Sequence, residues 1–84
     1  MRLESSSRFL RKARKLKEPR ASMLRAVLRR LVADPRDPVL GTHRLKGVLA
    51  DFWACTVDDD LRLLFLWEGD TLMLFDLGTH DQVN

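Results

Sequence analysis

Two apolar segments near the end of the chain constrain the fold more than any other feature. Residues 61–67 (LRLLFLW) and 71–77 (TLMLFDL) are each nearly all apolar, and only the tripeptide EGD at 68–70 separates them. A glycine between two such segments is typical of a tight hairpin turn. Because successive residues of a strand point to opposite faces, one face of the first segment carries Leu61, Leu63, Phe65 and Trp67. We therefore predict an antiparallel hairpin whose apolar face lies in the core.

The first 35 residues show the period of amphipathic helices instead. In the first of two segments, Phe9, Ala13 and Leu16 recur at i, i+4 and i+7, and the serines at 5–7 offer an N-cap. Glu18-Pro19 ends this segment, because proline is tolerated at the start of a helix but not inside it. The second segment repeats the stripe with Leu24, Val27, Leu28, Leu31 and Val32. We predict a helical hairpin, preceded by a very short strand over residues 2–4.

The order of these elements predicts an α+β fold, with the N-terminal helical hairpin packed on one face of a small antiparallel sheet. Residues 52–57 supply a further strand, Asp58-Asp59-Asp60 form a turn, and Gly78 is expected to end the last strand. The 84 residues make a single domain, with the short strand and basic hairpin in 1–35 and the sheet in 43–81.

The composition narrows the class of protein. Hydrophobic residues make up 45% and charged residues 32% of the chain, which is typical of a folded protein. No apolar stretch approaches the roughly 20 residues that span a bilayer, and the N-terminus has no apolar signal core. The single cysteine, Cys55, has no partner for an internal disulfide. These features favour a cytoplasmic protein that does not associate with membranes.

The two halves of the chain differ in charge. Residues 1–35 hold eleven Lys/Arg and three Asp/Glu, a net charge of +8, whereas residues 36–84 hold four and nine, a net charge of −5. A basic first half suits an anionic partner, either nucleic acid or an acidic protein. A solvated helix surface that happens to use Lys and Arg is the simpler alternative.

The chemically active residues cluster at the expected strand ends. Both histidines of the chain end a Gly-Thr-His tripeptide, His43 before the sheet and His80 after its last strand. Asp60 stands in the turn before the central strand, Arg62 lies on that strand, and Lys46 follows three residues after His43. Polar groups held at strand ends can converge on the uncovered face of a sheet.

Two imidazoles, a carboxylate and two cations suit metal-free cleavage of RNA. The ribose 2′-OH must lose a proton as it attacks phosphorus, and the departing 5′-oxygen must gain one. Histidine can do both near neutral pH, and each well-placed acid or base contributes roughly 10²–10⁴ in rate. Arg62 and Lys46 could stabilise the charge that builds on the phosphoryl oxygens.

Simpler interpretations remain open for each of these residues. A histidine after Gly-Thr can merely cap a turn, and three consecutive aspartates are more often a solvated turn than a metal site. No carboxylate and histidine recur at a spacing typical of metal ligands, and no Gly-rich phosphate loop or other cofactor motif is present. The aromatic residues that alternate with aliphatic ones favour a place in the core over base stacking: Trp53, Trp67 and Phe75.

The region from 43 to 81 resembles a known family. The segments HRLKG, FWACTVDDDLRLLF and LFDLGTHD are similar, in order and spacing, to the toxin branch of the RelE/ParE superfamily, and most closely to its YafQ-like members. The upstream segments SSRFLRKARKL and LVADP fit the same family, so the resemblance covers nearly the whole chain. It implies a small microbial-ribonuclease-like fold, cleavage of mRNA on the ribosome and neutralisation by a cognate antitoxin. Together with the metal-free chemistry of the residues, this predicts an enzyme that needs no cofactor.

The resemblance also implies roles for particular residues. His43, Asp60 and His80 match catalytic positions of the family, while Lys46 and Arg62 match basic positions that can bind the scissile phosphate. Which histidine is the base and which the acid stays open. The basic helices are expected to contact ribosomal RNA and mRNA on the ribosome, through Arg8, Arg11, Lys12 and Lys15.

Two departures from the family pattern keep alternatives open. Thr56 stands where YafQ-like members carry a further active-site histidine, and the chain ends in Asn84 where an aromatic residue is common. One alternative is a catalytically weakened ribosome- or RNA-binding protein. The other is a ParE-like inhibitor of DNA gyrase, which shares the fold but has no need of His43 and His80.

Overall fold

The computed structural model describes residues 1–79. Its regular elements in chain order are β1 (Arg2–Ser5), α1 (Ser7–Arg14), α2 (Arg20–Ala33), β2 (His43–Arg44), β3 (Trp53–Thr56), β4 (Leu61–Glu68) and β5 (Thr71–Thr79). Two short 3₁₀ turns, η1 (Pro38–Leu40) and η2 (Gly47–Leu49), flank β2. No helix of this part of the chain is both long enough and apolar enough to cross a membrane.

All five strands belong to one sheet with the order β1-β5-β4-β3-β2. The central pairs β2–β3, β3–β4 and β4–β5 are antiparallel, which confirms the predicted hairpin. β1 pairs with β5 in parallel, so the sheet is mostly antiparallel rather than wholly so. Parallel neighbours need a long connection between them, and the helical hairpin that follows β1 is part of that connection.

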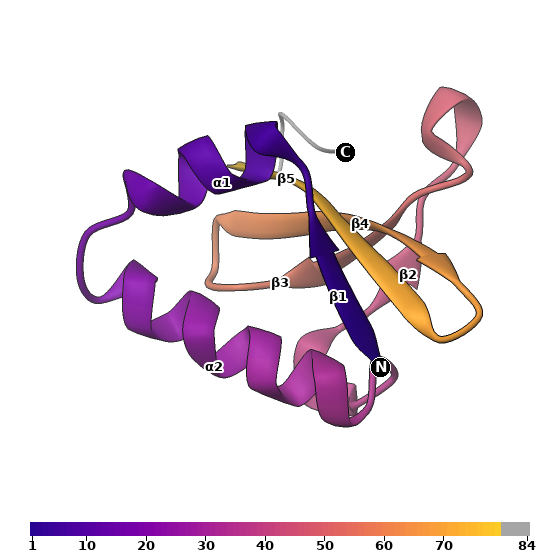
Figure 1. Ribbon diagram of the computed structural model, residues 1–84, viewed down its shortest axis with the longest axis horizontal. Coiled ribbons are helices and arrows are strands. Elements are labelled where there is room, and N and C mark those ends of the chain that lie inside the picture. The colour runs from indigo at the N-terminus through magenta and orange to yellow at the C-terminus, as the bar shows by residue number, and fades with distance from the viewer. Residues whose placement is uncertain (80–84) are drawn as a thin grey trace.

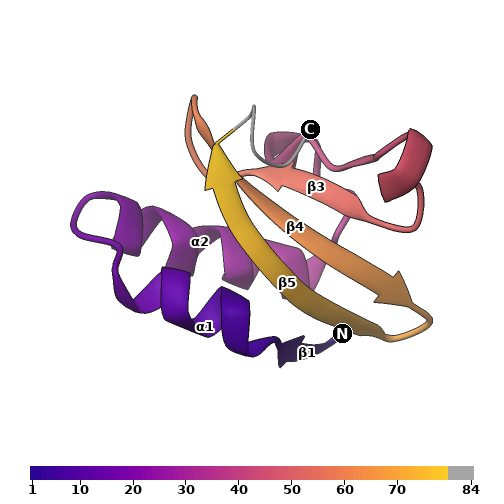
Figure 2. The ribbon, with the colours of Figure 1, turned by 90° about the horizontal axis from the view of Figure 1, so that it is seen from above.

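The helices cover one face of this sheet (Figures 1 and 2). Phe9 of α1 and the buried stripe of α2 pack on the alternate residues of β4 and β5 that face them, as the period of the sequence predicts. The main core consists of Phe9, Leu24, Val27, Leu31, Leu40, Cys55, Val57, Leu61, Leu63, Phe65, Leu72, Leu74 and Leu77. The α+β prediction is therefore confirmed.

The opposite face is partly covered, which the sequence analysis did not predict. A second, smaller core cluster contains Leu45, Ala54 and Leu64, with Leu49, Phe52 and Phe75 packed against it. Leu64 is consequently buried, although it alternates with the residues that face the helices. The segment between β2 and β3 supplies half of this cluster, and it leaves Arg62 at the uncovered end of the same face.

The prediction that Gly78 ends the last strand was wrong. β5 continues to Thr79, and Gly78 pairs with Arg62 of β4. The register of the β4–β5 pair shifts between Leu64 and Phe65. Such an irregularity inserts an extra residue into one strand and bends it.

The C-terminal half of β5 has no strand partner on the side away from β4, because β1 ends at Ser5, opposite Leu74. Residues of α1 satisfy its carbonyl groups instead. Ser6, the N-cap of α1, accepts a hydrogen bond from the Phe9 backbone at 3.0 Å and donates one to the carbonyl of Phe75 at 2.6 Å. Lys12 donates to the carbonyl of Leu77 at 2.9 Å. The helix thus protects an exposed sheet edge.

Candidate active site

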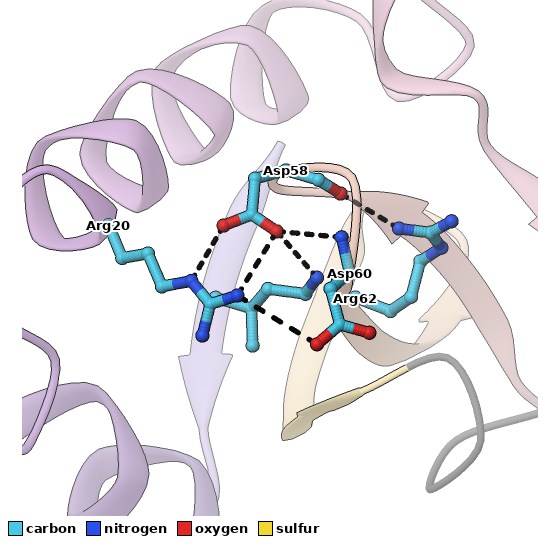
Figure 3. A network of polar contacts seen from close by, with 5 residues as sticks. Arg20, Asp58, Asp60 and Arg62 are labelled. Atoms are coloured by element: carbon cyan, nitrogen blue, oxygen red, sulfur yellow. Dashed lines mark hydrogen bonds and ion pairs between the residues drawn. The ribbon is translucent and has the colours of Figure 1, made fainter.

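The turn between β3 and β4 is organised by the carboxylate of Asp58 (Figure 3). Its Oδ1 accepts hydrogen bonds from the backbone N–H groups of Asp60, at 2.8 Å, and Leu61, at 2.7 Å. Its Oδ2 accepts one from Nε of Arg20, on α2, at 2.7 Å. The first of three consecutive aspartates is therefore a scaffold residue that joins the turn to the helical layer.

These contacts lower the pKa of Asp58 below its ordinary value. The hydrogen bond from the Leu61 N–H is the largest cause, and the hydrogen bonds from Asp60 and Arg20 act in the same direction, against the opposing effect of burial. Because the folded chain favours the charged carboxylate, Asp58 stabilises the fold above the ordinary carboxyl pKa near 4. That contribution is lost as the pH falls through the lowered pKa.

The two predicted site residues beyond this turn have different surroundings. The Asp60 side chain is 59% exposed, and its Oδ2 lies 3.9 Å from Nη2 of Arg20, on the helical side. Arg62 is half-buried and donates from Nη1 to the backbone carbonyl of Asp58 at 2.9 Å (Figure 3). Within residues 1–79, no carboxylate forms an ion pair with Arg62. The turn therefore holds the arginine without neutralising its charge.

His43 of the edge strand β2 and Lys46, three residues later, lie together. Both are exposed, and they line a hollow of about 310 Å³ together with Arg44, Leu45 and Leu49. Nδ1 of His43 lies 3.1 Å from the carbonyl oxygen of Gly41. Because a carbonyl oxygen can only accept, this hydrogen bond requires the hydrogen on Nδ1. It leaves Nε2 of the neutral ring as a proton acceptor.

The strand register relates His43 to Arg62. His43 pairs with Ala54 and Ala54 with Leu64, so the side chain of His43 shares a face with Leu64 and hence with Arg62. Two strand spacings of about 4.8 Å and an offset of two residues at about 3.3 Å each place the two Cα atoms roughly 12 Å apart. A group bound between the two side chains is within reach of both.

The structure leaves the predicted role of His80 untested, since this residue lies outside the described part of the chain. Thr79, the last described residue, pairs with Leu61, one residue along from the pair of Gly78 with Arg62. Glycine has no side chain that could cover Arg62 from β5. Thr56 of β3, at the position where the family pattern has a histidine, pairs with Arg62 of β4.

The four basic residues predicted to contact RNA divide into two pairs. Lys12 is bound to Asp76, with Nζ 2.8 Å from Oδ1, and Arg8 lies 3.8 Å from the other oxygen of the same carboxylate. Arg11 and Lys15 are exposed, and within residues 1–79 neither forms an ion pair. The structure thus gives Lys12 a role in joining α1 to β5 and leaves Arg11 and Lys15 available to a partner.

Sequence reasoning missed Asp58, Arg20 and Asp76 as supports of this region. A weak signal was available for Asp58, because an aspartate at the start of a turn often accepts hydrogen bonds from the backbone two and three residues ahead. No comparable signal marks Arg20 or Asp76, whose partners are 38 and 64 residues away in the sequence. Within residues 1–79, no three His, Cys, Asp or Glu side chains gather as they would around a metal ion.

Solved structures share this architecture. The crystal structure of YafQ from E. coli strain BL21(DE3) has 22% identity and a TM-score of 0.78, covering 99% of this chain and 98% of that one. The structure of E. coli YafQ in complex with DinJ has 21% identity and a TM-score of 0.66, with the same coverage. A YoeB/ParE toxin from Agrobacterium tumefaciens has 15% identity and a TM-score of 0.81, covering 95% of this chain and 99% of that one.

A further neighbour is a toxin from Helicobacter pylori whose crystal structure is metal-bound. It has 27% identity and a TM-score of 0.72, covering 100% of this chain and 99% of that one. A comparison with curated protein sequences found no match. Together, the structural neighbours define the fold as that of the RelE/ParE toxins.

A family profile narrows the class further. The profile described as the bacterial toxin of type II toxin–antitoxin systems, YafQ, matches residues 1–84, the full length of the chain. The protein therefore belongs to the YafQ family of toxins, which confirms the resemblance inferred from HRLKG, the aspartate turn and the second Gly-Thr-His.

Replacing Asp58 with alanine is expected to lower the free energy of unfolding by about 2 kcal/mol, because two backbone N–H groups and Arg20 lose their acceptor. Urea denaturation measures this, and Asp59→Ala, at the exposed neighbouring position, should change it by less than about 0.5 kcal/mol. The difference between the native chain and Asp58→Asn should be present at pH 7 and should disappear as the pH falls below 4. Equal losses for the Asp58 and Asp59 variants would contradict the scaffold role.

Replacing Lys12 with methionine is expected to lower the free energy of unfolding by about 1 kcal/mol, because Asp76 and the carbonyl of Leu77 lose a charged donor. The methionine keeps most of the apolar length of the side chain, so the change isolates the ammonium group. The matched control is Arg11→Met on the same helix, which should leave unfolding in urea unchanged within about 0.5 kcal/mol. If both variants unfold like the native chain, Lys12 does not join α1 to β5.

Proposed function

We propose that this toxin is an endoribonuclease that cuts mRNA on the ribosome, without a metal ion, by attack of the ribose 2′-OH. The observation that carries the proposal is the placement of His43. Its hydrogen bond to Gly41 leaves Nε2 as an acceptor, on the same face of the sheet as the guanidinium of Arg62, which has no ion-pair partner among residues 1–79. A proton acceptor and a phosphate-binding cation on one face are what such a reaction needs.

In the proposed reaction, two histidines transfer protons and two cations bind the phosphate. Nε2 of His43 takes the proton of the 2′-OH as that oxygen forms a bond to the adjacent phosphorus. The bond from phosphorus to the 5′-oxygen breaks, and His80 gives that oxygen a proton. The products are a 2′,3′-cyclic phosphate and a free 5′-hydroxyl. Arg62 and Lys46 stabilise the negative charge on the phosphoryl oxygens.

Asp60 is assigned to the site with a less direct role. Its exposed carboxylate stands in the turn that leads into Arg62, but its ion-pair partner is Arg20 on the helical side. We assign it to orient the turn and the bound RNA rather than to exchange a proton. A cleavage assay that compares Asp60→Ala with Asp59→Ala separates this role from the effect of removing one negative charge from the turn.

The proposed partners follow from charge and from the family. E. coli YafQ forms a complex with DinJ, and by analogy we propose a cognate antitoxin for this chain. The net charge of +8 over residues 1–35 suits an acidic segment of such an antitoxin, and equally the phosphates of ribosomal RNA. Arg11 and Lys15 are the exposed residues that we assign to the RNA contact.

Cleavage of mRNA on translating ribosomes, mapped by primer extension, tests the proposed reaction. The native toxin should give cuts in phase with codons, and His43→Ala and His80→Ala should each reduce the cleavage rate by at least about 10²-fold, because each removes one proton-transfer group. Leu45→Val, a conservative change beside His43, is the matched control and should retain the rate.

Three outcomes would contradict parts of this proposal. Intact mRNA under conditions in which the native toxin still arrests growth would favour a gyrase target. Ribosome binding without cleavage would favour a catalytically weakened protein, which the threonine at position 56 beside Arg62 would explain. Loss of cleavage after EDTA treatment of purified toxin, with recovery on adding a transition metal, would contradict the metal-free mechanism.

Affinity for ribosomes should fall with salt if α1 contacts ribosomal RNA. The slope of log affinity against log salt concentration is roughly 0.7–0.9 per phosphate neutralised. The double variant of Arg11→Met and Lys15→Met should therefore reduce the slope by about 1.5 without changing the fold. An unchanged slope would remove these two residues from the RNA contact, and Arg29→Met on the exposed side of α2 serves as a control for the loss of one charge.

A further inference from the structure

The two tryptophans of the chain meet at the end of the sheet farthest from the aspartate turn. Trp53 of β3 and Trp67 of β4 pack edge to face, with their ring centroids 5.0 Å apart. The guanidinium carbon of Arg36 lies 5.2 Å from one centroid and 5.1 Å from the other. Both distances are within the range of a cation–π contact, so the rings hold the arginine head group in place.

A second arginine and a carboxylate complete this cluster. Arg44, the pairing partner of Trp53, lies with its guanidinium carbon 5.8 Å from that ring. Asp51 and Gly69 line the same hollow, which has a volume of about 240 Å³. Within residues 1–79, neither arginine forms an ion pair, and Nε of Arg44 donates a hydrogen bond to the carbonyl oxygen of Ala50 at 2.8 Å.

This arrangement offers a planar surface as well as charge. Arg36 is exposed, so a ligand can reach its guanidinium from solvent. Proteins that bind single-stranded RNA stack unpaired bases on aromatic rings and on such guanidinium planes. The carboxylate of Asp51 repels a bare phosphate but can accept a hydrogen bond from the N–H group of a base.

We propose that this hollow, formed by Arg36, Arg44, Asp51, Trp53 and Trp67, binds one unpaired nucleobase of a single-stranded RNA, stacked on the guanidinium of Arg36. The inference rests on the proposed function, because it requires an RNA substrate or an RNA surface. It adds a recognition subsite separate from the residues assigned to cleavage.

The edge strand connects this subsite to the proposed cleavage face. His43 and Arg44 are consecutive in β2, so their side chains point to opposite faces of the sheet. His43 shares its face with Ala54 and Arg62, whereas Arg44 shares the other face with Trp53. An RNA strand that passes around the two-residue edge strand can place its scissile phosphate on one side and a base on the other.

An acidic peptide is the competing ligand, and the geometry disfavours it. A carboxylate binds the N–H edge of a guanidinium and gains nothing from the stacked plane, while Asp51 repels it. A nucleobase can stack on the guanidinium plane, and its N–H groups can donate a hydrogen bond to the carboxylate of Asp51. The two ligands therefore respond differently to Arg36→Lys, which keeps the charge but removes the planar group.

The intrinsic fluorescence of the chain reports directly on this hollow. Both tryptophans of the chain line the hollow, and the chain contains no tyrosine. The probe is an RNA hexamer of mixed sequence with 2′-O-methyl groups, which cannot be cleaved because the attacking hydroxyl is blocked. A ribose-phosphate hexamer without bases carries the same phosphates and serves as the control ligand. We expect saturable quenching by the first and not by the second.

The variants test the guanidinium plane. Arg36→Lys and Arg36→Ala should both raise the dissociation constant of the hexamer by about tenfold, the effect of losing one stacked base. Arg29→Lys, at an exposed position of α2, should leave it unchanged. Equal affinity of the native chain and Arg36→Lys would overturn the proposal, as would equal quenching by the hexamer without bases. Quenching by a polyglutamate peptide that depends on Arg36 would identify an acidic protein segment as the ligand instead.

Failure of this inference is distinguishable from failure of the proposed function. The same preparations are assayed for mRNA cleavage on ribosomes. Quenching that depends on Arg36, in a toxin that leaves mRNA intact, would retain the base subsite and reject the nuclease. Cleavage by a toxin whose tryptophan fluorescence does not respond to the hexamer would retain the nuclease and reject the subsite.

Discussion

The carboxylate of Asp58 holds together the part of the molecule on which the proposed chemistry depends. It accepts hydrogen bonds from two backbone N–H groups of its own turn and from Arg20 of α2, so one side chain joins the turn, the sheet and the helical layer. The same residue offers its backbone carbonyl to Arg62. Loss of Asp58 would therefore disturb both the stability of the turn and the position of the arginine that we assign to the scissile phosphate.

Edge protection explains why the basic helix is not simply an RNA-binding surface. β1 is too short to pair with the C-terminal half of β5. Ser6 and Lys12 donate hydrogen bonds to the carbonyl groups of β5 that β1 does not reach. Lys12 and Arg8 in addition neutralise Asp76. A charge that is engaged within the fold contributes less to a long-range attraction, so the net charge of the first half overstates what α1 offers to a partner.

Period and turn chemistry in the sequence were sufficient to predict the helical hairpin, strands β3 to β5 and the apolar stripes of the helices, except that Val32 of the second stripe is 37% exposed. They did not predict β2 or the place of Leu40 in the core. They could not predict the cluster around Leu64, because the segment that covers it has no regular period. Nor could they predict the partners of Arg20 and Asp76, which are distant in sequence. The tryptophans were predicted to lie in the core, and both pack partly against it, but their contacts with Arg36 and Arg44 depend on tertiary structure alone.

The alternation of side chains along a strand gives the edge strand β2 two distinct surfaces. With one residue on each face, it presents an imidazole beside the proposed cleavage site and a guanidinium beside the tryptophans. A longer edge strand would expose more unpaired N–H and C=O groups. The short strand thus limits the risk of edge-to-edge association, and it also leaves a narrow rim around which a single-stranded RNA can pass. Arg44 also lines the hollow beside His43, so a substitution of Arg44 changes the surroundings of the imidazole as well as the proposed base subsite.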